Sequence, residues 1–291
     1  MTQLSDFRSG TQPLTGQVAL VTGSGRGLGR AYAIALAKAG ATVAVTARTE
    51  SEIQTVQREI EQQGGHALAI SVDVTNKNAV AKLVTTIEQQ LGPIDLLVNN
   101  AGGLRAIGRV TEIDADDWWH EVEINLLGPF LCSQAVLPGM ITRKRGRIIN
   151  VASGGGLSAF DCFSAYSISK TALIRLSESL AIENKEYGIG VFAIHPGNVR
   201  TSMSEYLHDS EVVGQRAPWM QQTWRQRFAE ATDTPIERSV TLVLQLAAGH
   251  ADTLSGRYID AEDDLTELLD HADEIQSKDL YALRLREFSE T

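Results

Sequence analysis

The sequence predicts an α/β fold built on a doubly wound parallel sheet, and three observations support this. Short apolar runs of strand length alternate along the chain with longer segments whose apolar residues recur at helical spacing. The short runs are continuously apolar, as expected for strands that are covered on both faces of a parallel sheet. At 291 residues and 43% hydrophobic content, the chain is large enough for one sizeable α/β domain or two small ones. Right-handed crossovers then place helices on both faces, as in Rossmann-type folds.

Seven apolar runs are expected to form the strands of one sheet. They cover residues 17–22, 42–47, 66–74, 93–102 (a strand that runs into a loop), 146–153, 188–197 and 256–261. Helices are expected between them, over residues 29–40, 50–65, 77–92, 114–140 and 166–188. Asp114 is expected to cap the fourth helix, and Gly64 and Gly65 to end the second. Residues 199–235 are less regular.

Charge and cysteine usage argue against several classes of protein. The net charge of −10 gives no indication of nucleic-acid binding. Cys132 and Cys162 lie in apolar contexts outside any C-x-x-C pair, so reduced thiols in or near the core are expected. No apolar run of 18 residues, no signal-peptide pattern and no cluster with metal-ligand spacing is found. We therefore expect a soluble cytoplasmic protein without membrane, nucleic-acid or metal partners.

One domain is expected over residues 1–260, followed by an acidic helical extension at 261–291. The extension holds ten acidic and three basic residues. Its apolar residues recur at helical spacing at Leu265, Leu268, Leu269, Ala272 and Ile275, and then continue at Leu280, Leu283 and Leu285. Because a solvated tail does not need such a stripe, it is predicted to pack on the body of the protein or on a neighbouring subunit. The alternative is an exposed acidic helix with no partner.

A glycine-rich turn joins the first strand to the first helix, in the stretch VTGSGRGLGRA. Glycines there allow a tight turn and a close approach of the backbone to a ligand. The helix that follows presents unpaired N–H groups and a partial positive charge at its N-terminus, which suits a pyrophosphate. The residues expected to form this cradle are Gly23, Ser24, Arg26, Gly27, Leu28 and Gly29.

Tyr166 and Lys170 lie four residues apart after the fifth expected strand. On a helix this spacing places both side chains on one face, about one turn apart. A phenol and an ammonium held together indicate a proton-transfer site, and the alternative is a surface pair on an ordinary helix. His195, which directly precedes Pro196 at the end of the sixth strand, is interpreted as structural or as part of a pocket wall rather than as a base.

Five motifs together resemble the classical short-chain dehydrogenase/reductase family, over roughly residues 15–260. They are T-G-x-x-x-G-x-G (Thr22, Gly23, Gly27, Gly29), NNAG (99–102), Ser153, Y-x-x-x-K (166–170) and HPGNVRT (195–201). The extended subgroup of that family needs Gly at position 26, where this chain has Arg, so its epimerases and dehydratases are disfavoured. The resemblance implies oligomers, often tetramers, and a nicotinamide dinucleotide as the cofactor.

The resemblance implies that the cofactor is NADP(H). Ala47 stands where NAD-preferring members carry an acid that binds the ribose hydroxyls, and Arg26 and Arg48 match basic residues of NADP-preferring members. Two guanidiniums would bind the 2′-phosphate by charge-assisted contacts, and the alternative is two exposed arginines. Asp73 and Val74 match the contacts to the adenine edge. Contacts to the ribose and the nicotinamide carboxamide match Asn100, Val199 and Thr201.

The resemblance implies a catalytic tetrad of Asn125, Ser153, Tyr166 and Lys170. Tyr166 would exchange a proton with the substrate oxygen, Ser153 would polarise the carbonyl, and Lys170 would also bind the nicotinamide ribose. Asn125 would hold a water that feeds protons toward Lys170, unless it only satisfies a helix kink before Pro129. An ammonium about 4 Å from the phenol, at an effective dielectric of about 20, would supply the roughly 4 kcal/mol that lowers the tyrosine pKa by about three units. Burial opposes this shift, so the charge of the nicotinamide or the helix N-terminus would have to help.

The expected substrate is a ketone or alcohol of medium to large size and partly hydrophobic character. Residues 199–235 are expected to form a mobile lid, whose apolar surface comes from Tyr206, Leu207, Trp219, Met220 and Trp224. The alternative is that the tryptophans only pack the lid or an oligomer interface. Glycines 154–156 leave room beside the carbonyl, and Phe160 and Phe163 would line that space.

Two rival functions remain open for the same fold. One is reduction of 3-oxoacyl thioesters in fatty-acid-type chain elongation, for which Arg200, Arg216, Arg225 and Arg227 of the lid would face the acidic carrier. The other is a non-catalytic nucleotide-sensing or scaffold protein. The intact tetrad argues against that second rival, because binding alone does not need Tyr166.

Overall fold

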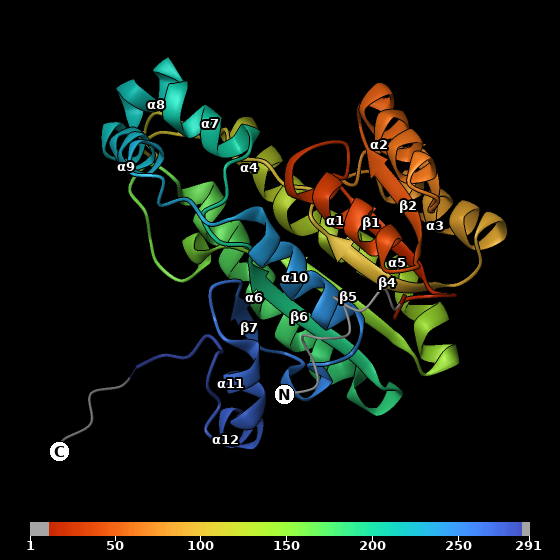
Figure 1. Ribbon diagram of the computed structural model, residues 1–291. Helices are drawn as coiled ribbons and strands as arrows, with labels where there is room; N and C mark the ends of the chain where they lie inside the picture. Colours follow the sequence, from red (N-terminus) through yellow and green to blue (C-terminus); the bar gives the residue numbers. More distant parts are fainter. Residues whose placement is uncertain (1–11, 287–291) are drawn as a thin grey trace.

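The computed structural model describes residues 12–286 and contains one seven-stranded sheet (Figure 1). All neighbouring strands pair in parallel, in the order β3-β2-β1-β4-β5-β6-β7, which confirms the predicted fold class. The strands are Val18–Thr22 (β1), Thr42–Ala47 (β2), His66–Ser71 (β3), Ile94–Asn99 (β4), Gly146–Val151 (β5), Ile189–His195 (β6) and Tyr258–Asp260 (β7). The strand order reverses between β1 and β4, and ligands of such sheets bind at the carboxyl ends of the strands beside this point.

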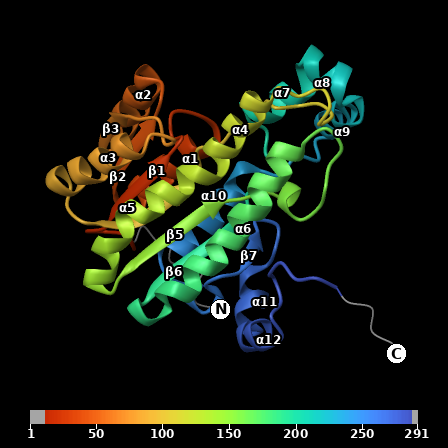
Figure 2. The same cartoon turned by 180° about the vertical axis from the view of Figure 1, so that it is seen from behind.

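Two layers of helices cover the sheet, and each layer closes its own apolar core (Figure 2). One layer consists of α1 (Gly27–Lys38), α2 (Glu50–Gln62) and α10 (Ile236–Ala247). The other consists of α3 (Lys77–Gln90), α5 (Gly128–Arg143) and α6 (Ser164–Asn184). Short 3-10 turns lie at Gly154–Gly156, Lys185–Tyr187 and Asp252–Leu254. Both cysteines are buried and unpaired, as predicted.

The single helix predicted over residues 114–140 is interrupted. It consists of α4 (Ala115–Val122), a π-helical turn (Glu123–Leu127) and α5, and Asp114 caps it by accepting from two backbone N–H groups. Pro129 has no N–H to donate to the preceding turn, and such residues widen or kink a helix. By length and composition alone, residues Ala115–Arg143 could cross a membrane. In this fold their apolar side chains pack against the sheet, which accounts for that composition.

Residues after β6 form three short helices rather than irregular chain. They are α7 (Ser202–Asp209), α8 (Glu211–Arg216) and α9 (Pro218–Ala229), and they lie together beyond the sheet in Figure 1. A small core of their own includes Leu207, Val213 and Ala217, which pack against Leu104 and Phe163 of the body. This cluster is called the lid below.

The tail packs on its own subunit, as one of the two predicted arrangements requires. Its helices are α11 (Leu265–Asp270) and α12 (Ala272–Ser277), and their buried face joins the core of the α1–α2–α10 layer through Leu265, Leu268, Ala272 and Ile275. The predicted stripe continues only in part. Leu283 is half-buried against a cluster that includes Tyr258, whereas Leu280 and Leu285 are 42% and 87% exposed.

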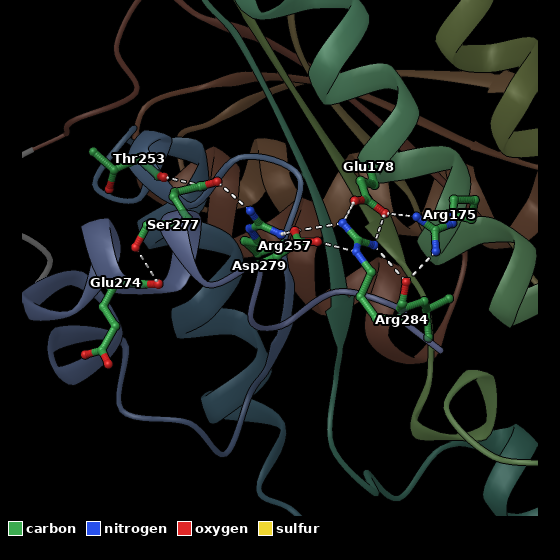
Figure 3. A network of polar contacts seen from close by, with 10 residues as sticks. Arg175, Glu178, Thr253, Arg257, Glu274, Ser277, Asp279 and Arg284 are labelled. Atoms are coloured by element: carbon green, nitrogen blue, oxygen red, sulfur yellow. Dashed lines mark hydrogen bonds and ion pairs between the residues drawn. The ribbon is translucent and has the colours of Figure 1, made fainter. Parts of the chain in front are cut away.

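A polar network joins the end of the tail to β7 and α6 (Figure 3). Arg257 donates to Asp279 at 2.8 Å and to Gln276 at 2.6 Å. Arg284 pairs with both Asp279 and Glu178 of α6. The backbone of the tail also accepts a hydrogen bond of 2.9 Å from the N–H of Tyr258 in the edge strand. The tail therefore covers part of that edge, where unpaired backbone groups would otherwise be available to another chain.

Candidate active site

A cavity of about 410 Å³ opens at the carboxyl ends of β5 and β6, under the lid. Ser153 follows β5, His195 ends β6, and Tyr166 comes from the first turn of α6. Most of the remaining wall is apolar and comes from Leu28, Leu104, Phe160, Phe163, Val199, Met203, Leu207, Trp219, Met220 and Trp224. The fold thus brings two hydroxyl groups of the predicted tetrad to the wall of one largely apolar space.

Gly154 and Gly155, which line the cavity, keep the space beside the hydroxyls open, whereas Gly156 allows this segment to approach α6 closely. A Cβ atom added at Gly155 would lie 3.2 Å from the ring of Tyr166 and 3.4 Å from that of Phe160. One added at Gly156 would lie 2.8 Å from the backbone of Lys170. The N–H of Gly155 donates to the Ser153 hydroxyl oxygen at 3.0 Å, which fixes this side chain. The prediction that these glycines make room at the reacting carbon agrees with this geometry.

Lys170 is buried behind Tyr166. Its side chain is 5% exposed, and its ammonium donates to the carbonyl oxygen of Val151 at 2.8 Å. The ammonium lies 5.8 Å from the centre of the Tyr166 ring. Burial lowers the pKa of Lys170 to about 8, because a charged group loses its hydration, although the carboxylate of Glu121 opposes this shift.

The pKa of Tyr166 is raised above its ordinary value rather than lowered. Burial is the main cause, and the negative charge of Glu121 adds to it, whereas a hydrogen bond from Ser153 acts in the opposite direction. The opposing effect of burial therefore outweighs the predicted help from Lys170. The phenol of this structure is a proton donor at neutral pH.

Asn125 lies in the π-helical turn and holds the loop that follows β4. Its Oδ1 accepts from the N–H of Gly103 at 2.9 Å, and its Nδ2 donates to the carbonyl of Gly103 at 2.9 Å and to the Ser169 hydroxyl at 3.2 Å. A Cβ at Gly102 would lie 3.1 Å from Oδ1 of Asn125 and 3.7 Å from Nζ of Lys170, so both side chains surround that glycine. The structure thus places Asn125 close to Lys170 in the π-helical turn, and its predicted role of holding a water that feeds protons toward Lys170 stays a prediction.

Glu121 is a member of this site that the sequence analysis missed. Its side chain is 4% exposed and one carboxylate oxygen accepts from the N–H groups of Arg105 at 2.5 Å and Ala106 at 2.8 Å. Burial raises the pKa of this carboxyl, although the two N–H donors and the charge of Lys170 favour its ionised form. Glu121 stands four residues before Asn125, on the same side of the helix, and this spacing was the available signal.

The glycine-rich turn fits the predicted phosphate cradle. Gly23 has a φ of +63°, and a Cβ there would lie 2.8 Å from the backbone of Ala101; one at Gly29 would lie 2.3 Å from the carbonyl oxygen of Gly23. No side chain caps the N-terminus of α1, so its first N–H groups remain available to an anion. Asn100 donates to the carbonyls of Thr22 and Gly23, at 2.9 and 3.1 Å, and so holds the turn itself.

The cradle and the cavity are continuous. Leu28 of α1 and the residues Val199 and Thr201 line the cavity, and a Cβ at Gly27 would lie 3.8 Å from the side chain of Thr201. Ser24 is fully buried and accepts from the N–H of Thr46 at 2.7 Å. A dinucleotide bound at the turn could therefore extend its nicotinamide end toward Ser153 and Tyr166.

The residues predicted to bind the adenosine end gather beyond β2 and β3. Arg26 and Arg48 are both exposed there. Partial burial opposes ionisation of Asp73, but hydrogen bonds from Thr75 and the charge of Arg48 outweigh it and hold the pKa of that carboxyl below its usual range. Val74 is buried against Gly128, where a Cβ would lie 2.8 Å from its side chain.

Glu52 is a second residue that the sequence analysis missed. Its carboxylate lies 3.7 Å from the guanidinium of Arg26, and its side chain closely approaches Gly25 of the turn. No carboxylate within 4 Å of Arg48 is found in the described part of the chain. The charge of Arg48 nevertheless acts on the carboxylate of Asp73, so both arginines stay candidates for a 2′-phosphate, and Arg48 is the one without an ion pair. Acidic residues are common in the first turn of any helix, so nothing in the sequence singled out Glu52.

Comparisons with known proteins agree with this geometry. A family model described as short chain dehydrogenase matches residues 17–212. The chain belongs to the short-chain dehydrogenase family. A short chain dehydrogenase of Pseudocercospora fijiensis is 36% identical over 265 residues, which cover 89% of this chain and 84% of that protein. A 3-oxoacyl-[acyl-carrier-protein] reductase of Synechocystis is 38% identical over 201 residues, covering 69% and 81%.

Solved structures of short-chain dehydrogenases have the same fold. A variant of actinorhodin polyketide ketoreductase, solved with NADPH, superimposes with a TM-score of 0.77 at 31% identity, covering 86% of this chain and 96% of that one. A short-chain type dehydrogenase/reductase from Mycobacterium marinum has a TM-score of 0.75 at 30% identity, covering 88% and 96%. The family consists of oxidoreductases that use nicotinamide cofactors and act on the CH–OH or C=O group of small molecules.

Proposed function

We propose that this short-chain dehydrogenase transfers a hydride between NADP(H) and the carbonyl or secondary alcohol of a medium to large, partly hydrophobic substrate. The observation that carries the proposal is the cavity in which the Ser153 and Tyr166 side chains meet largely apolar walls, with Lys170 buried behind them. NADP(H) would supply the hydride. The exposed Arg48, which has no carboxylate within 4 Å in the described part of the chain, favours the phosphorylated cofactor.

In this mechanism the chain binds and orients the reacting oxygen and moves one proton. Ser153 donates a hydrogen bond to the substrate oxygen and polarises the carbonyl, which stabilises the charge that develops there. Tyr166 gives its phenolic proton to that oxygen during reduction and takes it back during oxidation. Lys170 would hold the nicotinamide ribose and, when charged, would favour the phenolate. Asn125 fixes the Gly103 loop beside Lys170.

The experiment that tests the proposal is Tyr166→Phe, which removes the acidic proton and keeps the ring. We expect NADPH binding, followed by fluorescence, to persist while turnover falls by about 10²–10⁴-fold. If the variant keeps more than about a tenth of the wild-type rate, another group carries the proton. If the wild-type protein binds NADPH but turns over no ketone, the rival in which the site only binds a nucleotide is favoured.

A second candidate function is reduction of 3-oxoacyl thioesters on an acidic carrier. Three of the four arginines noted in the lid, Arg200, Arg216 and Arg225, are exposed and could face such a carrier. The similarity to the Synechocystis reductase also supports it. Assays with NADPH on a panel of free ketones and of 3-oxoacyl thioesters separate the two candidates, because a carrier-dependent reductase would prefer the thioesters. Homo-oligomer formation remains a prediction alongside both functions.

A further inference from the structure

One face of helix α9 forms a wall of the active-site cavity. The residues of α9 that line the cavity are Trp219, Met220, Thr223, Trp224 and Arg227. Their spacing follows the helical repeat, so they extend along one side of α9 from its first turn to its last. Trp219 and Arg227 stand at the two ends, eight residues apart, which corresponds to about 12 Å along the helix axis at about 1.5 Å per residue.

The Trp219 end of the cavity is apolar and aromatic. The ring of Trp219 meets Phe160 and Phe163 edge to face, with centroids 5.9 and 6.0 Å apart. Phe160 in turn lies beside Gly155, next to the ring of Tyr166. A substrate group in this part of the cavity would contact aromatic rings and could bury apolar surface against them.

The Arg227 end carries an uncompensated positive charge. Among the lining residues that the structure describes, Arg227 is the only one that is Lys, Arg, Asp or Glu. Its guanidinium has no carboxylate within 4 Å in the described chain. Its Nε is buried without a hydrogen-bond partner, and Nη1 donates to the carbonyl of Thr232 at 3.2 Å. The group also lies 5.6 Å from the ring centre of Trp224.

This arrangement is unusual within the molecule. Arg147 and Arg257, which are also shielded from water, each face a carboxylate at 2.6 and 2.8 Å. A charge that is removed from water is costly unless a counter-charge or hydrogen bonds replace the lost hydration. Arg227 is half-buried and its Nε has neither in the described chain, so a bound ligand is the group that could complete it.

The reacting centre lies between these two ends. His195 ends β6 on the Arg227 side, where the charges of Asp260, Glu262 and Asp263 act on it together with that of Arg227. Its Nδ1 accepts from the N–H of Gly154 at 3.2 Å. Gly154 directly follows Ser153, the residue expected to bind the substrate oxygen. Tyr166 and Phe160 lie on the other side of the same segment. A substrate whose oxygen contacts Ser153 can thus reach the aromatic end with one arm and Arg227 with the other.

We propose that the substrate of this site is a ketone, or the matching secondary alcohol, with an apolar group on one arm and a carboxylate on the other, and that Arg227 binds the carboxylate. The proposal rests on the proposed oxidoreductase function and names the substrate class of that site. A guanidinium can bind a carboxylate through two N–H groups, which orients the substrate as well as attracting it. The two unlike ends would then present one face of the carbonyl for reduction.

The test compares two ketones that differ only in charge. One carries an aryl or alkyl group and a terminal carboxylate, and the other is its methyl ester. We expect wild-type kcat/KM with NADPH to favour the carboxylate by about 10–100-fold, the range of a charge-assisted contact. Arg227→Met should abolish this preference by lowering kcat/KM for the carboxylate far more than for the ester, whereas Arg227→Lys should keep part of the preference. The matched control is Arg225→Met, which removes an exposed arginine from the same helix and should change neither substrate.

A binding measurement accompanies the kinetics. Quenching of tryptophan fluorescence by each ketone, measured with NADP⁺ present, should report tighter binding of the carboxylate to wild type than to Arg227→Met. The KM for NADPH and the thermal unfolding of each variant show whether the cofactor site and the fold are intact. If the two ketones bind wild type equally, or if Arg227→Met weakens both to the same extent, the proposal is overturned and Arg227 only packs the lid. Carboxylate binding without any Tyr166-dependent turnover would instead contradict the proposed oxidoreductase function.

Discussion

Burial of the Lys170 ammonium leads to a quantitative prediction about the free energy of unfolding and its dependence on pH. Replacing it in Lys170→Met keeps an unbranched side chain of similar length and removes the charge. The pKa of Lys170 falls from an ordinary value of 10.5 to about 8 in the folded protein, because burial disfavours the charged form. A shift of one pKa unit corresponds to about 1.4 kcal/mol. At a pH where the lysine is protonated in both the folded and the unfolded protein, the buried charge therefore lowers the free energy of unfolding by about 3 kcal/mol.

The sign of the effect sets the pH window. Below pH 8 the lysine is charged in the folded and the unfolded protein, and the full cost is present. Between pH 8 and 10.5 the folded protein has lost the proton while the unfolded chain still binds it, so stability rises with pH in this window. The free energy of unfolding of the wild type, relative to Lys170→Met, should therefore increase by about 3 kcal/mol between pH 7 and pH 11.

At pH 7 the gain from removing the charge is largely offset in Lys170→Met. Loss of the hydrogen bond from the ammonium to Val151 costs about 1.5–3 kcal/mol, so the two proteins should be of similar stability at pH 7 and the wild type the more stable at pH 11. Urea unfolding of both proteins without cofactor, at pH 7 and pH 11, measures the difference. The control is Lys185→Met, an exposed lysine just after α6, which should show no such pH dependence. A pH-independent difference between wild type and Lys170→Met would refute the claim that this ammonium is strained by burial.

Three further predictions concern the charges of the site and the tail. Glu121→Gln keeps an acceptor for the loop N–H groups but removes the negative charge that raises the pKa of Lys170. The ionisation of Lys170 in the pH–rate profile should therefore move to lower pH. An unchanged profile would show that the charge of Glu121 does not influence Lys170. Arg48→Ala should lower kcat/KM for NADPH by about 10–100-fold and leave NADH kinetics nearly unchanged, and equal losses with both cofactors would contradict the 2′-phosphate contact. A chain that ends after Ala261 loses three large buried side chains of the tail, each of which contributes up to about 1.5–3 kcal/mol to the free energy of unfolding. It should melt at a clearly lower temperature. An unchanged melting temperature would show that the tail does not stabilise the fold.

The order of strands and helices could be predicted because local patterns decide it. Continuous apolar runs and glycine-rich turns are properties of short segments, and the structure follows them closely in the first six strands. The lid was harder to predict. Its three helices are only six to twelve residues long, and their stability depends on packing against Leu104 and Phe163, which lie far away in the sequence. Short helices of this kind have little intrinsic preference that a sequence pattern could reveal.

In the site, too, residues that belong to sequence motifs could be predicted, and residues whose role depends on packing could not. Ser153, Tyr166 and Lys170 could be located because they belong to motifs with fixed spacing, and the structure places them together at the carboxyl ends of the strands. Glu121 could not, because its importance comes from burial against the loop after β4 and from its charge beside Lys170. The π-helical turn between α4 and α5 was missed for a related reason: the apolar spacing around Pro129 fits a continuous helix, and only the missing N–H of proline disturbs it.

The two ionisations at the centre also bear on the direction of the proposed reaction. Burial raises the pKa of Tyr166 and lowers that of Lys170, and the carboxylate of Glu121 favours the protonated state of both groups. At neutral pH the phenol therefore carries its proton, which is the form needed to protonate a carbonyl oxygen as hydride arrives. The oxidative direction needs the phenolate, and the ammonium of Lys170 alone does not overcome the cost of burying that anion. In the proposed reaction these residues thus hold the phenol in its proton-donating form, and oxidation would need either a higher pH or a further positive charge close to the phenol.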